Sequence, residues 1–336
     1  MIEKTKTINA TSELRQNIIT GEWVIIATGR GKRPDDFLQE NRKIDDAKTD
    51  PFADPTASDQ HNDTLIYRDD DGEWTTRVFP NKYPALTPVD EVAVLEDGPH
   101  VGVGGYGVHE LVVTRDPHNH FARLDVPAIA EVIDAYQDRY LTHMRSRAIR
   151  YVSIFHNHGP KSGASVSHPH SQILALPVVP IVVQAELDAV NRFYKKNHIN
   201  PFRVMLEHEL SVRSRLVAEN DDFVVLCPFA PRMAMEMYIM PKDPQPYFER
   251  ITDAKKIALA EVLQAALRAL DRGLNNPDYN LFLHTAPCDG WDHVQYMWYI
   301  DIMPRTAKIA GFELATSMEI VTVAPEDATQ FLRAQL

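Results

Sequence analysis

Hydrophobic and polar positions follow two spacings along the chain, and each spacing predicts a different kind of element. Short apolar or alternating runs bounded by turn-forming residues predict β-strands. These runs lie at 22–28, 64–68, 74–79, 91–96, 109–114, 151–156 and 167–176. Apolar positions at helical spacing predict helices over 126–147, 181–197 and 252–274. The polar stretch 35–63 indicates a long loop, and the five glycines of 98–107 indicate a mobile loop before the next strand.

The second half of the chain repeats the order of elements in the first half. Four residues recur unchanged 127 positions later, Asp116, Pro117, Phe121 and Arg123 as Asp243, Pro244, Phe248 and Arg250. Each set follows a strand-like run and precedes a long helix, after which come a strand, a loop and a further strand. We therefore expect an α+β chain of two tandem units, 1–197 and 198–336, each an antiparallel sheet covered by a long helix.

Composition narrows the functional classes. The 336 residues include 35 Lys and Arg against 47 Asp and Glu, a net charge of -12, which disfavours non-specific binding to nucleic acid. The two cysteines, Cys227 and Cys288, exclude a disulfide framework and a CxxC zinc finger. No apolar run is long enough to span a membrane and the N-terminus is polar, so we expect a cytoplasmic protein. The fourteen histidines instead point to imidazole chemistry.

The run Ser167-His168-Pro169-His170-Ser171-Gln172 is the strongest candidate for that chemistry. On a strand, His168, His170 and Gln172 share one face. Pro169 lacks an N–H and favours an edge strand. In the second half, Gln295 and Met297 align with the two histidines, and a thioether cannot replace a nucleophilic imidazole. We therefore expect only the first unit to supply a nucleophile.

A loop before this run has the residues of a phosphate site. Gly159 and Gly163 let backbone amides approach an anion closely, and Lys161, Ser162 and Ser165 add donors. A phosphate beside an imidazole nucleophile favours phosphoryl or nucleotidyl transfer.

Two other readings of the same residues are open. A metal-binding or metallohydrolase domain could use the histidines of this region, His118, His120, His156, His158, His168 and His170. A non-catalytic nucleotide sensor is the second reading, and the intact HPHSQ run argues against it.

Five motifs resemble the galactose-1-phosphate uridylyltransferase family of the histidine triad superfamily. They are GRGKRP (29–34), RVFPNKYPAL (77–86), GVHELVV (107–113), FHNHG…GASVSHPHSQ (155–172) and RTAKIAGFEL (305–314). The resemblance implies two histidine-triad-like units and a ping-pong reaction, in which His170 attacks the α-phosphorus of a nucleotide and becomes covalently nucleotidylated. It implies that Gln172 bonds the transferring phosphoryl oxygens and that His168 belongs to the same catalytic run.

The resemblance also implies roles for residues outside the HPHSQ run. Arg30, Asn157, Gly163 and Ser165 match phosphate-contacting positions, and Asn81 matches the nucleoside pocket. Lys308, Phe312 and Glu313 match the acceptor side.

Departures from the family concern its metals. Asp50-Pro51-Phe52-Ala53 stands where many members have the CxxC of a structural zinc site, although His118 and His168 match the other two ligands. At the second metal site of the family, Glu186 and His284 match, but Met297 and Tyr299 replace two histidines. We therefore expect no required metal or cofactor.

The sequence leaves two interpretations of the substrate open. An altered sugar-side pattern, in which Glu319 replaces a neutral residue, tilts us slightly towards a relative that moves AMP from an ADP-sugar or adenylyl sulfate to phosphate. The alternative is a metal-free uridylyltransferase acting on UDP-glucose and a hexose 1-phosphate. Partners would thus be a nucleotide donor and a phosphate, sulfate or sugar-phosphate acceptor. Since family members are usually dimers, we expect a homodimer.

Overall fold

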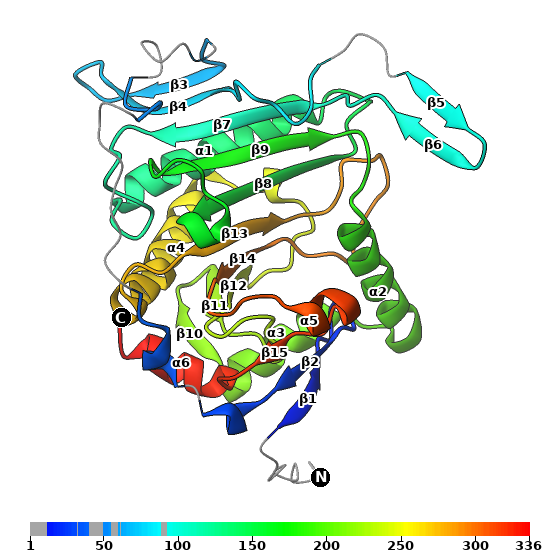
Figure 1. Cartoon of the computed structure of the whole chain (residues 1–336), viewed down its shortest axis with the longest axis vertical. Coiled ribbons are helices and arrows are strands. Elements are labelled where there is room, and N and C mark those ends of the chain that lie inside the picture. The colour runs from blue at the N-terminus through cyan, green and yellow to red at the C-terminus, as the bar shows by residue number, and fades with distance from the viewer. Residues whose placement is uncertain (1–11, 32, 40–49, 55–59, 61, 89–92) are drawn as a thin grey trace.

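A ten-stranded antiparallel sheet forms the centre of the molecule in a computed structural model, which describes residues 12–31, 33–39, 50–54, 60, 62–88 and 93–336 (Figure 1). Across the sheet the strand order is β10-β11-β12-β14-β13-β8-β9-β7-β4-β3. In chain order these strands are β3 (Leu65–Arg68), β4 (Trp74–Pro80), β7 (Val108–Thr114), β8 (Tyr151–His158), β9 (His170–Leu176), β10 (Leu216–Glu219), β11 (Phe223–Leu226), β12 (Met237–Pro241), β13 (Tyr279–His284) and β14 (Tyr299–Pro304).

Two smaller sheets flank this one. The segment β1 (Glu13–Gln16) pairs with β2 (Trp23–Ile26), which also pairs in parallel with β15 (Ile320–Val321) near the other end of the chain. The hairpin of β5 (Val94–Asp97) and β6 (His100–Val103) projects from the body, as Figure 1 shows, and we call it the arm. The arm corrects the expectation of a mobile loop over 98–107, because Gly98, at a φ of 59°, permits a two-residue turn that pairs the flanking residues.

Two long helices cover one face of the central sheet. They are α1 (Val126–His143) and α4 (Asp253–Leu274), and their apolar sides form the main core with inward residues such as Ile154, Ile173 and Ile302. The opposite face is covered at its β11–β12 end by α2 (Ile181–Asn197) and α3 (Pro201–Val212), and at its β4–β7 end Phe52 packs against Phe79, Leu111 and Val113. Shorter helices are η1 (Thr28–Arg30), η2 (Pro34–Phe37), η3 (Pro160–Ser162), η4 (Phe248–Arg250), α5 (Gly311–Thr316) and α6 (Pro325–Arg333).

Helix boundaries follow from local capping chemistry. Asp125 accepts a hydrogen bond from Ala128 N at 2.9 Å and begins α1, and Thr252 accepts one from Lys255 N and begins α4. Asn275 adopts the left-handed conformation that ends α4. The predicted helices over 181–197 and 252–274 are confirmed, whereas α1 ends at His143, four residues before the predicted boundary.

The sequence predicts one sheet for each half of the chain, but the strands of both halves lie in a single sheet. They are joined because β8 pairs with β13, with His158 opposite Tyr279 at one end and Ile154 opposite Leu283 at the other. The order β7-β9-β8 on one side of this junction mirrors β12-β14-β13 on the other. The α+β class is thus confirmed, while the division of the chain into units 1–197 and 198–336 stays a prediction. Within the described residues, none of the helices has the length and apolar character needed to cross a membrane.

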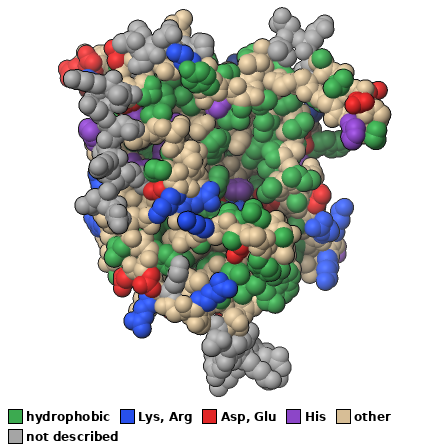
Figure 2. Space-filling view, viewed as in Figure 1, with side chains coloured by type: hydrophobic (Ala, Val, Ile, Leu, Met, Phe, Trp, Pro, Cys, Tyr) green, Lys and Arg blue, Asp and Glu red, His purple; other side chains and the backbone are tan. Residues whose placement is uncertain are grey.

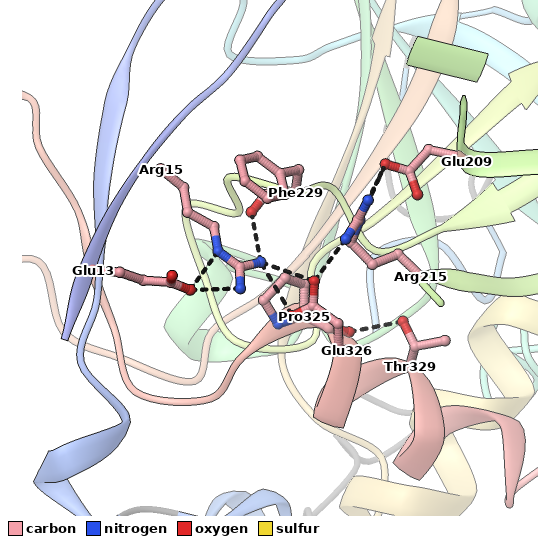
Figure 3. A network of polar contacts seen from close by, with 8 residues as sticks. All are labelled: Glu13, Arg15, Glu209, Arg215, Phe229, Pro325, Glu326 and Thr329. Atoms are coloured by element: carbon pink, nitrogen blue, oxygen red, sulfur yellow. Dashed lines mark hydrogen bonds and ion pairs between the residues drawn. The ribbon is translucent and has the colours of Figure 1, made fainter. Parts of the chain in front are cut away.

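A polar network connects the two ends of the described chain (Figure 3). Glu326 on α6 accepts hydrogen bonds from Arg15 on β1 at 3.0 Å and from Arg215 at 2.7 Å. Arg215 also donates to Glu209 on α3, and both guanidinium groups lie over the Phe229 ring. These contacts hold the small N-terminal sheet against the second half of the chain.

Candidate active site

The HPHSQ run lies at the centre of the sheet. Strand β9 begins at His170 and pairs with β7 on one side and β8 on the other, so the expectation of an edge strand is wrong. Pro169 is compatible with a central position because it lies just before the first paired residue, where no ladder hydrogen bond requires its N–H. His168 also lies before the strand, which therefore starts three residues later than predicted.

The face of β9 that bears His170 and Gln172 is the face that α1 and α4 leave uncovered. Cross-strand partners share a face, and Phe155 and Asn157 on β8 are half-buried while His156 between them is buried. Figure 2 shows this side of the molecule as a hollowed surface in which hydrophobic side chains gather. A ligand can therefore approach the sheet from this side.

Backbone hydrogen bonding determines which nitrogen of His170 carries the hydrogen. Its Nδ1 lies 2.8 Å from the His168 carbonyl oxygen, an acceptor, so Nδ1 carries the hydrogen. In the neutral ring Nε2 then holds the lone pair, which is the form a nucleophile needs. Burial lowers the pKa of His170 from its ordinary value of 6.5, although the bond to His168 opposes this effect. The ring is thus poised as a neutral nucleophile.

His168 is held at both ring nitrogens. Its Nδ1 lies 2.7 Å from Asp50 Oδ2, and its Nε2 lies 2.6 Å from the carbonyl oxygen of Thr114. The Phe52 ring meets the rings of both His168 and His170 edge-on, with centroids 5.9 and 5.2 Å away. Because both ring nitrogens face protein oxygens, His168 positions its neighbours rather than contacting a substrate through its ring.

Gln172 is oriented by His109, a residue that the sequence analysis did not select. Ala85 N donates to His109 Nδ1 at 3.2 Å, so His109 Nε2 carries the hydrogen and can donate to Gln172 Oε1 at 2.9 Å. Burial lowers the pKa of His109, which keeps this ring neutral. With Oε1 occupied, the Gln172 amide group is free to donate to a phosphoryl oxygen. The signal for His109 was its place in the GVHELVV motif.

Asn81 joins the same network at the end of β4. Its backbone N donates to the His109 carbonyl at 2.8 Å, and its Oδ1 accepts from Tyr83 N at 2.9 Å. Its Nδ2 lies 3.2 Å from His109 Nε2, so the side chains of Asn81 and Gln172 meet at the same ring nitrogen of His109.

The predicted phosphate loop forms η3 and its flanks, and its donors are divided. Asn157 accepts from Asn280 at 2.7 Å on the catalytic face, and Gly163 lies beside it with a positive φ of 92°. Ser162 instead turns its hydroxyl to the Gly159 carbonyl, 2.6 Å away. Lys161 donates to Gln39 at 2.6 Å and is exposed. Ser165 is also exposed. Of these donors, Asn157 and Gly163 lie best for a phosphate.

The remaining predicted residues lie on η1 and in or just before α5, outside the strands of the central sheet. Arg30 is exposed on η1, Lys308 is exposed just before α5, and Phe312 is exposed on α5. Glu313 accepts from Ala310 N at 3.1 Å and so caps α5. Within the described residues no hydrogen bond or ion pair links any of these four to His170 or Gln172. Lys32 of the GRGKRP motif falls outside the described residues.

The positions of the second family metal contain a hydrogen-bonded cluster. Tyr299 Oη donates to Glu186 at 2.6 Å, and Tyr296 Oη donates to the other carboxylate oxygen. Burial raises the pKa of Glu186, but the His284 ring, 3.7 Å from the carboxylate, and the hydrogen bonds from the tyrosines outweigh it and hold that pKa below its ordinary value. Met297 is fully buried. Both oxygens of Glu186 are therefore engaged by hydroxyl donors.

The histidines proposed for a metallohydrolase do not converge on one point. His120, His156 and His158 lie in a ring stack against Tyr279, whereas His168 contacts Asp50 and Thr114. His118 is exposed. Over the described ranges, no three His, Cys, Asp or Glu side chains are arranged to hold a metal ion.

Sequence comparisons agree with the geometry. Residues 2–180 match the family model described as galactose-1-phosphate uridyl transferase, N-terminal domain, and residues 112–336 match a domain of unknown function. The chain is 31% identical to ADP-glucose phosphorylase of Arabidopsis thaliana over 97% of this chain and 93% of that protein. It is 27% identical to galactose-1-phosphate uridylyltransferase of Thermotoga maritima over 96% and 98%.

Solved structures extend the likeness to the fold. The Arabidopsis thaliana ADP-glucose phosphorylase with bound ADP-glucose superposes with a TM-score of 0.80 at 28% identity, covering 96% of this chain and 98% of that one. A uridylyltransferase structure superposes with a TM-score of 0.74 at 26% identity and the same coverage. Since a model of the family matches more than half of the residues, and its motifs surround the His170 imidazole, the chain belongs to the galactose-1-phosphate uridylyltransferase family.

Proposed function

We propose that this chain is a nucleotidyltransferase that carries an adenylyl group on His170, from a nucleotide-sugar donor such as ADP-glucose to inorganic phosphate. The observation that carries the proposal is the His170 ring, whose Nδ1 is bonded to the His168 carbonyl, so that Nε2 holds the lone pair of the neutral ring. Similarity along almost the whole chain to an ADP-glucose phosphorylase favours the adenylyl group over the uridylyl group.

In the first half-reaction, Nε2 of His170 attacks the α-phosphorus of the donor. A P–N bond forms as the P–O bond to the sugar phosphate breaks, and the sugar phosphate leaves as an anion. The hydrogen stays on Nδ1, where the His168 carbonyl oxygen faces the cationic ring. The Gln172 amide, oriented by His109, donates to the transferring phosphoryl oxygens.

In the second half-reaction, an oxygen of inorganic phosphate attacks the same phosphorus. The P–N bond breaks, ADP forms and the neutral imidazole is restored. We propose that Asn157 and Gly163, the loop residues that lie best for a phosphate, bind phosphate groups, and that Asn81 binds the nucleoside. Lys308, Phe312 and Glu313 would serve the acceptor.

Intact-mass analysis after incubation with a donor, without acceptor, tests the function. We expect an AMP adduct with ADP-glucose, and H170N should form none while keeping its circular dichroism spectrum. UDP-glucose and adenylyl sulfate serve as the competing donors. A full UMP adduct with UDP-glucose and none with ADP-glucose would overturn the adenylyl assignment. Turnover by H170N would overturn the covalent mechanism.

We also propose that the enzyme is a cytoplasmic homodimer. The scarcity of cysteine supports a reducing compartment. The arm supports self-association, because Val94 and Val101 are 63% and 73% exposed on a hairpin that projects from the body. Cell fractionation checks the compartment.

A further inference from the structure

Asp50 makes two contacts that leave its carboxylate little freedom. Its Oδ1 accepts from Phe52 N at 2.9 Å, which forms a tight local turn, and its Oδ2 lies 2.7 Å from His168 Nδ1. The side chains of Asp50 and His168 are 5% and 0% exposed. A buried, charge-assisted hydrogen bond of this kind is strong and directional.

The second ring nitrogen of His168 is held by another element. Its Nε2 lies 2.6 Å from the carbonyl oxygen of Thr114, the last residue of β7. Two oxygen acceptors, from opposite sides, therefore define the plane and position of this ring. Because the ring is held, the backbone of residue 168 is held with it.

The backbone of residue 168 in turn orients the nucleophile. The His168 carbonyl oxygen accepts the Nδ1 hydrogen of His170 at 2.8 Å, and this bond directs Nε2 away from the backbone. The Phe52 ring, which belongs to the Asp50 turn, meets the His170 ring edge-on. The turn at Asp50 thus contacts His170 directly through the Phe52 ring and indirectly through His168.

The structural zinc that the family resemblance implies does not fit these residues. Two ligand atoms of a tetrahedral zinc lie roughly 3.3 Å apart, given metal–ligand distances near 2.1 Å. The 2.7 Å contact between Asp50 and His168 is a direct hydrogen bond and leaves no room for an ion between the two atoms. His118 is exposed, and Ala53 stands at the position of the second cysteine.

We propose that Asp50 is a positioning residue, which fixes the nucleophile through His168 by a direct carboxylate–imidazole contact in place of a metal. This inference rests on the proposed function, since it concerns the rate at which His170 becomes nucleotidylated. It assigns a role to the Asp-Pro-Phe turn that substitutes for the family's cysteines.

Single-turnover adduct formation in D50A and D50N tests this role, with D116A as the matched control. Asp116 forms the same kind of turn, since its Oδ1 accepts from His118 N at 2.8 Å, but it is exposed and contacts no ring of the site. We expect D50A to form the adduct on the order of 10- to 100-fold more slowly, the cost of losing an orienting partner. D50N keeps a neutral acceptor and should lose less, and D116A should match the wild type.

The donor concentration for half-maximal rate should stay unchanged in both Asp50 variants, because orientation of His170 affects the chemical step and not donor binding. Wild-type rates in a folded D50A would overturn the inference while leaving the proposed function intact. Should D50A fail to fold, D50N decides, and a wild-type rate there overturns the inference. One equivalent of zinc in the purified wild type also overturns it. A wild type that forms no adduct with any donor refutes the proposed function itself, and this inference with it.

Discussion

At the scale of single residues, hydrogen bonds to one polar atom of His170 and of Gln172 determine which other atom of each side chain is available to a substrate. The His168 carbonyl oxygen accepts the Nδ1 hydrogen of His170, and His109 Nε2 donates to Oε1 of Gln172. Each interaction leaves one functional atom available, a lone pair in the first case and an amide hydrogen in the second. The site is therefore oriented before substrate arrives, which lowers the reorganisation needed for reaction.

The pH dependence of adduct formation should reflect the burial of His170. Only the neutral ring has a lone pair on Nε2, and burial lowers the pKa of this ring from 6.5. The nucleophile therefore stays neutral to a lower pH than an exposed histidine, so the acid limb of the single-turnover rate should have its midpoint below pH 6.5. Rapid-quench measurements from pH 4.5 to 8 check this, and a midpoint above 6.5 would contradict the assignment.

At the scale of elements, a buried ion triad joins α1 to the catalytic sheet. Glu110 on β7 accepts from Arg139 at both oxygens, each at 2.9 Å, and from His143 Nε2 at 2.8 Å. Burial raises the pKa of Glu110, but the hydrogen bonds from His143 and Arg139 outweigh it and lower the pKa overall. The neighbouring residue on the strand is His109, so the triad fixes the part of β7 that orients Gln172.

Removal of one partner should therefore destabilise the protein strongly. R139A leaves a buried carboxylate with His143 as its remaining partner, and breaking a buried pair in this way costs about 3–5 kcal/mol of unfolding free energy. R203A is the matched control, because Arg203 and Glu207 form an exposed pair one turn apart on α3, worth about 0.5 kcal/mol or less. Urea unfolding of both variants measures the difference. Equal losses would show that the triad contributes no more than a surface pair.

At the scale of the whole molecule, the arm projects from the body and exposes apolar side chains. The pairing of Val94 with Val103 and of Glu96 with Val101 places three valines on one face of the hairpin. An isolated two-stranded hairpin is marginally stable in water. A second copy of the chain would bury this face, in agreement with the proposed homodimer.

The double variant V94D/V101D should separate the dimer into monomers. Two charges on the apolar face of the arm would have to be buried without partners in the interface, while the central sheet is untouched. Light scattering after size exclusion should give twice 38.1 kDa for the wild type and 38.1 kDa for the variant. The control is V212D, an exposed apolar position on α3. A V94D/V101D chain that remains dimeric would exclude the arm as the interface.

The sequence by itself determined the α+β class, most of the elements and the family. Helical and strand spacing report which side of an element is buried, and α2 and α4 match their predicted ranges within one residue. The HPHSQ run singled out His170 as the candidate nucleophile because few chemistries need that order of residues. Such features are local, so they can be read from neighbouring positions along the chain.

Only the tertiary structure decided how the site is held. The strand of His170 is central and not at an edge, since it pairs with β7 on one side and with β8 on the other. His109 orients Gln172 from 63 residues away, and Asp50 reaches His168 across 118. Lys161 and Ser162, selected for their spacing, turn to other partners. Spacing along the chain does not specify contacts between distant segments, because these depend on strand order and on the close packing of the core.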